Sequence, residues 1–112
     1  FIEQVMIVGE NRKFTAALIV PSFAHLKTWC ELKGIPYESN EQAIKNAEVV
    51  SRIQKEVDEY NHSFSHIEQV KKFELVSKEW TPDSGDLTPT LKLKRKLIAE
   101  RNKDLIEKIY AE

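Results

Sequence analysis

Two apolar runs rich in β-branched residues, near the start of the chain, constrain the fold more than any other feature. They cover residues 4–8 and 15–20, and the link at residues 9–13 has the glycine and polar content of a hairpin connection. We therefore expect two antiparallel strands. Both runs are almost continuously apolar, which is typical of central strands covered on both faces, so helices must supply the cover.

Helical patterns follow the two strands. Ser22 is placed to cap a short amphipathic helix that ends at Gly34. The stripe expected on one face of that helix consists of Leu26, Trp29 or Cys30, and Lys33. Residues 39–42 fit a capping box and predict a second helix, long or broken. Its expected stripe consists of Ala47, Val50, Ile53, Val57 and Tyr60.

The second half of the chain predicts one more strand and a terminal helix. After a break at residues 61–65, residues 70–76 alternate as a strand with Phe73 and Leu75 inward. Residues 78–90 have loop composition, and a helix from Arg95 carries a stripe of Ile98, Leu105, Ile106 and Ile109. The fold class is therefore α+β, a small three-stranded and mainly antiparallel sheet covered by helices.

Size and charge exclude several classes of protein. With 112 residues, the chain is one small domain, too short for a core plus a deep substrate pocket. Its net charge is −1 with both signs interspersed, which predicts neither nucleic acid nor an anionic membrane as partner. The longest apolar runs, residues 5–8 and 16–20, are far shorter than the roughly 20 residues of a membrane span.

Cysteine content and the first residues favour a cytoplasmic fragment. Cys30 is the only cysteine, so no intrachain disulfide can form and a reducing compartment is expected. The chain opens on Phe1 without an initiator methionine, a basic leader or an apolar signal core. We therefore expect a cytoplasmic protein and a segment of a longer chain.

A lysine in a Thr/Pro-rich turn is the main candidate for chemistry. Lys92 follows the turn at residues 85–91 and precedes the terminal helix, an arrangement that can aim one ammonium group at an anionic substrate. The alternative is a solvated lysine at a helix start. The basic run at residues 92–96 could also contact nucleic acid or phospholipid, but it is short and has no interleaved aromatic residues.

Other candidate sites are weaker. His62 and His66 have the spacing of a helical ligand pair, but the expected break between them and the absence of a completing ligand argue against a metal site. His25 and Cys30 are five residues apart, which does not place them face to face as a nucleophile and base. No metal ligand is assigned, and Trp29 and Trp80 are expected to pack in the core or at its rim.

Four segments resemble one family over essentially the whole chain. They are residues 2–9, residues 14–21, residues 66–73 and the lysine turn Gly85-Asp86-Leu87-Thr88-Pro89-Thr90-Leu91-Lys92. Their amino-acid sequences resemble those of the AMP-forming long-chain fatty-acid–CoA ligases, which belong to the adenylate-forming superfamily. In those enzymes a large N-terminal domain binds ATP and the fatty acid, and a small C-terminal α+β lid swings between two poses. The resemblance implies that residues 1–112 are this lid.

The resemblance also implies roles for the loop at residues 84–94. Lys92 matches the lysine that assists formation of acyl-adenylate and pyrophosphate in the first pose, before the lid rotates and helps to build the tunnel for thioester formation with CoA. The superfamily usually has glycine directly before this lysine, where this chain has Leu91, so Lys94 is the second candidate. Thr88 matches the motif's threonine, and Thr88 and Thr90 are weaker candidates for contact with the substrate or nucleotide.

Several parts of such a ligase lie outside this sequence. They are the phosphate loop, the acids that bind ribose and metal, and the hinge motif. The expected partner is therefore the N-terminal domain of the same chain, and ATP, Mg²⁺, CoA and a fatty acid are the expected ligands of the full enzyme. Any peripheral membrane contact would be made by the missing part. The fragment alone is expected to be inactive and to bind no ligand. A luciferase-like or peptide-synthetase lid and a non-enzymatic α+β interaction module are the alternatives.

Overall fold

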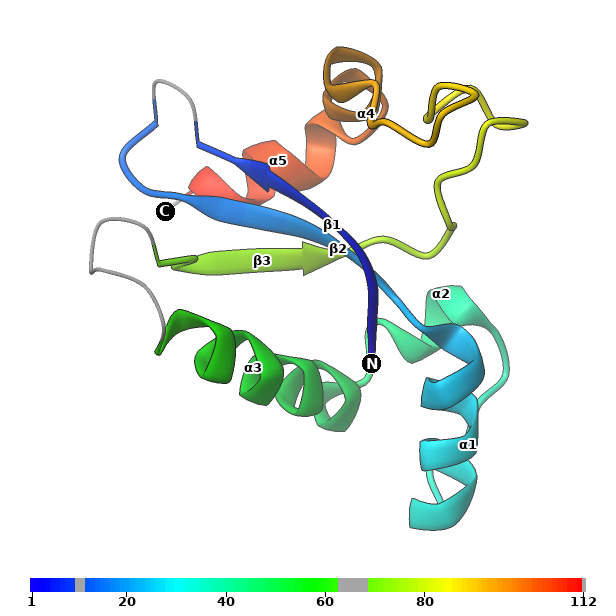
Figure 1. The fold of residues 1–112 in the computed structure, drawn as a ribbon. Helices are drawn as coiled ribbons and strands as arrows, with labels where there is room; N and C mark the ends of the chain where they lie inside the picture. The colour runs from blue at the N-terminus through cyan, green and yellow to red at the C-terminus, as the bar shows by residue number, and fades with distance from the viewer. Residues whose placement is uncertain (10–11, 63–68, 112) are drawn as a thin grey trace.

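The second apolar run forms the central strand of a three-stranded sheet with helices on both faces (Figure 1). The computed structural model describes residues 1–9, 12–62 and 69–111. The elements are β1 (Ile2–Val8), β2 (Ala16–Pro21), α1 (Phe23–Lys33), α2 (Asn40–Ala43), α3 (Ala47–Asn61), β3 (Lys72–Leu75), α4 (Arg95–Arg101) and α5 (Lys103–Tyr110). The predicted α+β class is confirmed.

The alternation of side chains along β2 divides the core into two clusters. One lies toward α1 and α3 and contains Ala17, Ile19, Leu26, Cys30, Ala43, Val49, Ile53, Val57, Val70 and Leu75. The other lies toward α4 and α5 and contains Met6, Ala16, Leu18, Val20, Val76, Trp80, Leu87, Ile98 and Ile109. Every residue of β2 is buried, as the continuous apolar run predicts for a central strand.

The expectation that β1 is also central is wrong, because β1 lies at the edge of the sheet. It pairs antiparallel with β2 as predicted, but Val5 and Ile7 are 39% and 36% exposed. Hydrogen bonds to Trp80 and Arg95 connect this strand to the other half of the molecule. The Gln4 amide donates to the Trp80 carbonyl and accepts from the Trp80 N–H, both at 2.8 Å, and the Arg95 guanidinium donates to the Ile7 carbonyl. These bonds connect the edge strand to the segment around the lysine turn.

The third strand is shorter than predicted and runs parallel to β2, so the sheet is mixed. A parallel neighbour requires a crossover connection, which α1, α2 and α3 provide between β2 and β3. Leu75 is buried and Phe73 packs on the same cluster, as expected. The Lys108 ammonium of α5 lies 3.2 Å from a carboxylate oxygen of Glu74 and joins the terminal helix to this strand.

The capping residues set the helix boundaries largely as predicted. Ser39 Oγ accepts from the Gln42 N–H at 3.1 Å, and Gly34 ends α1 with a left-handed φ of 71°. Ser22 occupies the N-cap of α1, but its hydroxyl contacts His25 Nδ1 instead of a helix N–H. Asn46 caps α3 and separates it from α2, so the broken form of the predicted helix is the observed one.

The predicted stripe of α3 is shifted by one position at its start. The buried residues are Val49, Ile53 and Val57, whereas Ala47 and Tyr60 are exposed. The terminal helix is likewise divided, because the side chain of Asn102 donates to the Ile98 carbonyl at 2.8 Å between α4 and α5. Within the described residues, no helix is long and apolar enough to cross a membrane.

Candidate functional site

Residues 87–93 form a small hairpin within the predicted loop. Leu87 and Leu93 face each other as an isolated antiparallel bridge. The Thr88 N–H donates to the Lys92 carbonyl at 2.9 Å, and the Leu91 N–H donates to the Thr88 carbonyl at 2.8 Å, which closes a β-turn. The Lys92 N–H donates to Thr88 Oγ1 at 3.0 Å. The turn therefore fixes the backbone from which the Lys92 side chain leaves.

Leu91 has a left-handed backbone, with φ 66°, and its side chain is 67% exposed. Three-residue hairpin loops place a residue in this region directly after the β-turn, a position that favours glycine. A side chain in this conformation costs about 1–2 kcal/mol. The backbone thus gives a physical reason for the glycine that usually precedes the lysine in the enzymes that the sequence resembles.

We expect Leu91→Gly to raise the free energy of unfolding by about 0.5–1 kcal/mol, because relief of the left-handed strain exceeds the added flexibility of the unfolded chain. Urea denaturation of the 112-residue chain measures the change. Leu32→Gly is the matched control, since Leu32 is 83% exposed within α1, and it should lower stability by about 1 kcal/mol. A loss of stability in both variants would contradict the assignment of strain to Leu91.

The candidate residues from the sequence lie around this turn. The Thr88 and Thr90 hydroxyl oxygens are 3.1 Å apart, so both contribute to the internal bonding of the turn. Lys92 is exposed next to the tip, and Lys94, also exposed, occupies the N-cap of α4. Because the Arg95 guanidinium is bonded to β1, residues 92–96 do not present four equivalent free cations. Lys92 is thus the cation of the loop nearest the turn.

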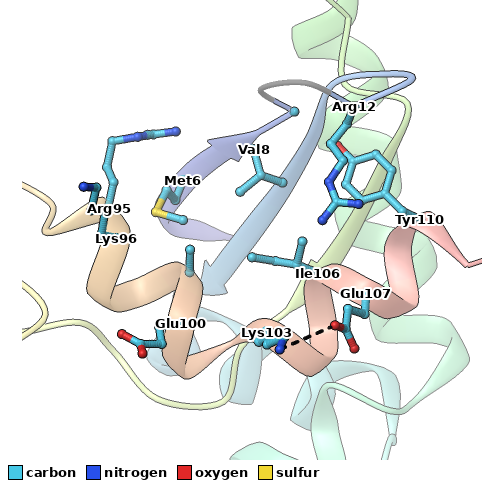
Figure 2. A pocket seen from close by; sticks show the side chains of 12 residues that line it. Met6, Val8, Arg12, Arg95, Lys96, Glu100, Lys103, Ile106, Glu107 and Tyr110 are labelled. Atoms are coloured by element: carbon cyan, nitrogen blue, oxygen red, sulfur yellow. Dashed lines mark ion pairs between the residues drawn. The ribbon is translucent and has the colours of Figure 1, made fainter.

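A cavity of about 420 Å³ lies between β1, α4 and α5 (Figure 2). The Arg12 guanidinium stacks 4.9 Å from the centre of the Tyr110 ring, and Lys103 lies 4.0 Å from a carboxylate oxygen of Glu107. Burial raises the pKa of Tyr110, and the charge of Arg12 partly offsets that rise. Since basic and acidic side chains are mixed on its walls, the cavity is a weaker candidate for anion chemistry than the exposed lysine.

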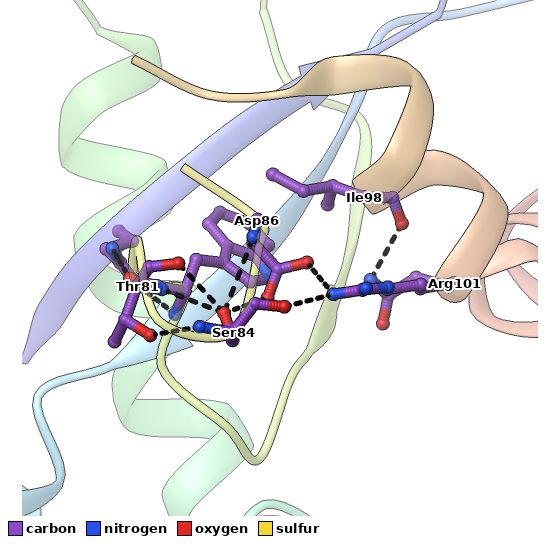
Figure 3. Close-up of polar contacts among 8 residues, drawn as sticks. Thr81, Ser84, Asp86, Ile98 and Arg101 are labelled. Atoms are coloured by element: carbon purple, nitrogen blue, oxygen red, sulfur yellow. Dashed lines mark hydrogen bonds and ion pairs between the residues drawn. The ribbon is translucent and has the colours of Figure 1, made fainter. Parts of the chain in front are cut away.

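Asp86 and Arg101 fix the base of the hairpin (Figure 3). Arg101 Nη1 donates to Asp86 Oδ1 at 2.9 Å and to the Ser84 carbonyl at 2.8 Å. Ser84 Oγ donates to Asp86 Oδ2 at 2.7 Å. The Asp86 carbonyl accepts from the Lys94 N–H at 2.9 Å, so the start and the end of the loop are joined through this aspartate.

No pattern in the sequence predicts this pairing. Asp86 follows Gly85 in a segment whose composition indicates only a turn, and Arg101 is fifteen residues further on, in a helix with several exposed charges. Helical spacing rules pair residues three or four apart, so they cannot connect a loop carboxylate to a distant guanidinium. The one indication was the aspartate itself, whose side chain tolerates turns and accepts hydrogen bonds there.

The alternative sites receive no support from the described residues. His66 lies outside them, so the pairing of His62 with His66 is not described, and within the described ranges no three His, Cys, Asp or Glu side chains are grouped to hold a metal ion. Cys30 is buried, and its burial, together with the nearby Glu48, raises the pKa of the thiol. A raised pKa disfavours the thiolate that a nucleophile requires, and His25 contacts Ser22 instead.

Comparison with protein families decides what kind of domain carries this hairpin. The family model for the AMP-binding enzyme C-terminal domain matches residues 1–112. The chain belongs to this family. As an AMP-binding enzyme C-terminal domain, it has the mixed α+β architecture that the resemblance implied, and that interpretation of the sequence is confirmed.

Curated relatives of this C-terminal domain include fatty-acid ligases. It is 32% identical over 110 residues to the long-chain-fatty-acid–CoA ligase FadD15 of Mycobacterium tuberculosis, covering 97% of this chain and 18% of that protein. It is 29% identical over 114 residues to long chain acyl-CoA synthetase 8 of Arabidopsis thaliana, covering 99% of this chain and 16% of that protein. The chain thus spans less than a fifth of the length of these relatives.

Solved structures share the fold of this C-terminal domain. The adenylation domain of a carboxylate reductase from Mycobacterium chelonae aligns with a TM-score of 0.74 at 20% identity, covering 99% of this chain and 16% of that one. The A-PCP didomain of the carboxylic acid reductase from Segniliparus rugosus, in complex with AMP, aligns with a TM-score of 0.71 at 17% identity, covering 97% and 14%. In both, a domain of this shape is a small part of a larger chain.

Proposed function

We propose that this domain is the lid of an AMP-forming long-chain fatty-acid–CoA ligase. In the first half-reaction, a carboxylate oxygen of the fatty acid attacks the α-phosphate of ATP, which forms acyl-adenylate and releases pyrophosphate. In the second, the sulfur of CoA attacks the acyl carbon and AMP leaves. The lid supplies Lys92 to the first step and then rotates for the second.

The observation that carries this proposal is the position of Lys92 directly after a left-handed residue in a hydrogen-bonded turn. That backbone is where the related enzymes usually place a glycine before their lysine, which supports Lys92 over Lys94 as the matching position. The Lys92 side chain is exposed, so its ammonium is free to enter an active site formed by another domain. The family and the curated long-chain relatives support the reaction class.

The chemical role proposed for Lys92 is electrostatic. Negative charge accumulates as a carboxylate approaches the α-phosphate, and a fixed ammonium between them lowers the energy of that arrangement in a water-poor cleft. No proton transfer is required. Thr88 acts through the turn, because its hydroxyl oxygen accepts a hydrogen bond from the Lys92 N–H. The Thr90 hydroxyl lies 3.1 Å from that of Thr88, and we propose that it contacts the nucleotide.

ATP, Mg²⁺, CoA and the fatty acid are then ligands of the full enzyme. The described residues offer no group of three metal-binding side chains, so the magnesium of the reaction would be held with ATP outside this domain. The main partner is the N-terminal domain of the same chain. We accordingly expect the isolated domain to be inactive, since a lysine without its partner surface contributes no preorganised field, and a cytoplasmic location stays a prediction.

The test is acid-dependent exchange of labelled pyrophosphate into ATP by the full-length protein that carries this chain. Exchange with a long-chain fatty acid and formation of its CoA thioester are the expected results, with no exchange by the 112-residue chain alone. Exchange only with an amino acid would favour a peptide-synthetase lid, and light emission from a luciferin would favour a luciferase-like one. Absence of exchange with any acid would leave the interaction module and overturn the proposal.

A further inference from the structure

Among the described residues, the Arg101 side chain donates its hydrogen bonds to the segment that begins the lysine loop (Figure 3). Arg101 is the last residue of α4, and one nitrogen, Nη1, donates to both Asp86 Oδ1 and the Ser84 carbonyl. The Asp86 side chain is only 11% exposed, and its second oxygen accepts from Ser84 Oγ. A carboxylate this buried requires its partners, because removing one leaves a charge that water can scarcely reach.

These hydrogen bonds connect the two ends of the loop that carries Lys92. The loop leaves this base at Asp86, passes through the hairpin and returns to α4 at Lys94, whose N–H donates to the Asp86 carbonyl. Arg101 then connects the far end of α4 back to the same aspartate. The loop and the helix that follows it are therefore held as one unit, which fixes the direction in which the Lys92 side chain leaves the domain.

We propose that the Asp86–Arg101 pair is the positioning device for Lys92, an inference that rests on the proposed function of this domain. A lysine that enters and leaves an active site with its domain makes no lasting contacts there, so its placement must be built into its own loop. Displacement of a reacting group by about 1 Å can lower a rate roughly a hundredfold. Asp86 and Arg101 are thus positioning residues, and the group that meets the substrate is Lys92.

The Glu74–Lys108 pair provides a comparison within the same fold. It also joins a terminal helix to another element, with an ammonium 3.2 Å from a carboxylate oxygen, but it connects α5 to β3 and has no bond to the loop. Loss of either pair removes one cross-element ion pair. Only loss of the Asp86–Arg101 pair should change the placement of Lys92.

The test uses the full-length protein with Arg101→Met, and with Lys108→Met as the matched control. In Arg101→Met we expect kcat for pyrophosphate exchange to fall roughly ten- to hundredfold with KM for ATP within about twofold, while thioester formation from supplied acyl-adenylate stays within about twofold. Both half-reactions of Lys108→Met should stay within about twofold of the wild type. Arg101→Lys should recover most of the exchange, because one donor nitrogen makes both bonds.

Two results would overturn the positioning role. One is an equal loss of both half-reactions in Arg101→Met, which indicates general damage to the domain, and the other is unchanged exchange. Should Arg101→Met fail to fold, Asp86→Asn repeats the test from the other partner, because it keeps the shape of the side chain and removes its charge. Lys92→Ala is measured in parallel. Exchange lost in Lys92→Ala but retained in Arg101→Met refutes only this inference, whereas exchange retained in both variants refutes the role proposed for Lys92 itself.

Discussion

Replacing Lys92 by alanine in the full-length protein should lower acid-dependent pyrophosphate exchange about 10²–10³-fold, the usual effect of removing one preorganised charge-stabilising group. Thioester formation from supplied acyl-adenylate should be retained, since the proposed mechanism withdraws the lysine in the second pose. The size of the first effect follows from the water-poor cleft, where an ammonium interacts with developing charge far more strongly than in bulk water. Exchange of labelled pyrophosphate and formation of the CoA thioester measure the two steps separately.

Lys94→Ala is the matched control for this prediction. Lys94 is an exposed lysine two residues along the same chain, so both variants lose one positive charge from the same surface. Its backbone N–H, which bonds to the Asp86 carbonyl, is retained in alanine, and Lys94 lies at the N-cap of α4 and not directly after Leu91. A loss of exchange in Lys94→Ala with normal exchange in Lys92→Ala would assign the role to Lys94 instead.

The sheet and helices were predictable where one strong local pattern decides the structure. The apolar run of β2 was long enough to specify a buried strand, and Ser39 and Gly34 marked helix ends through their own backbone chemistry. The edge position of β1 was not predictable, because its residues 5–8 form a continuous apolar run like that of β2. What distinguishes the two strands is the later return of β3 to pair with β2, a long-range choice that no local window contains.

The candidate site divides in the same way. The Thr/Pro-rich turn and the lysine after it are local features, and the sequence placed them correctly before the last helices. The left-handed conformation of Leu91 could not be predicted, because leucine seldom adopts that backbone conformation. Only the hydrogen-bonded turn around it requires it. The Asp86–Arg101 pair depends on how α4 packs against the loop, so it follows from tertiary structure and not from spacing.

Replacing Leu18 by alanine should lower the free energy of unfolding of the 112-residue chain by about 3–4 kcal/mol, within the range for fully buried leucines. Leu18 lies at the centre of β2 with no exposed surface, in the cluster that contains Leu87 of the lysine loop and Ile98 of α4. Because small domains are stable by only about 5–15 kcal/mol, this loss is a large part of the total. The midpoint of urea denaturation measures it if the slope of the transition is unchanged.

Leu32→Ala makes the same chemical change at a site where burial plays almost no part. Leu32 lies in α1 with 83% of its surface exposed, so its loss should change stability by at most about 0.5 kcal/mol. Similar losses in the two variants would contradict the central position of Leu18. A large effect confined to Leu18 would support one core shared by the sheet and the base of the lysine loop. The strand that specifies the fold would then also stabilise the segment proposed to carry the chemistry.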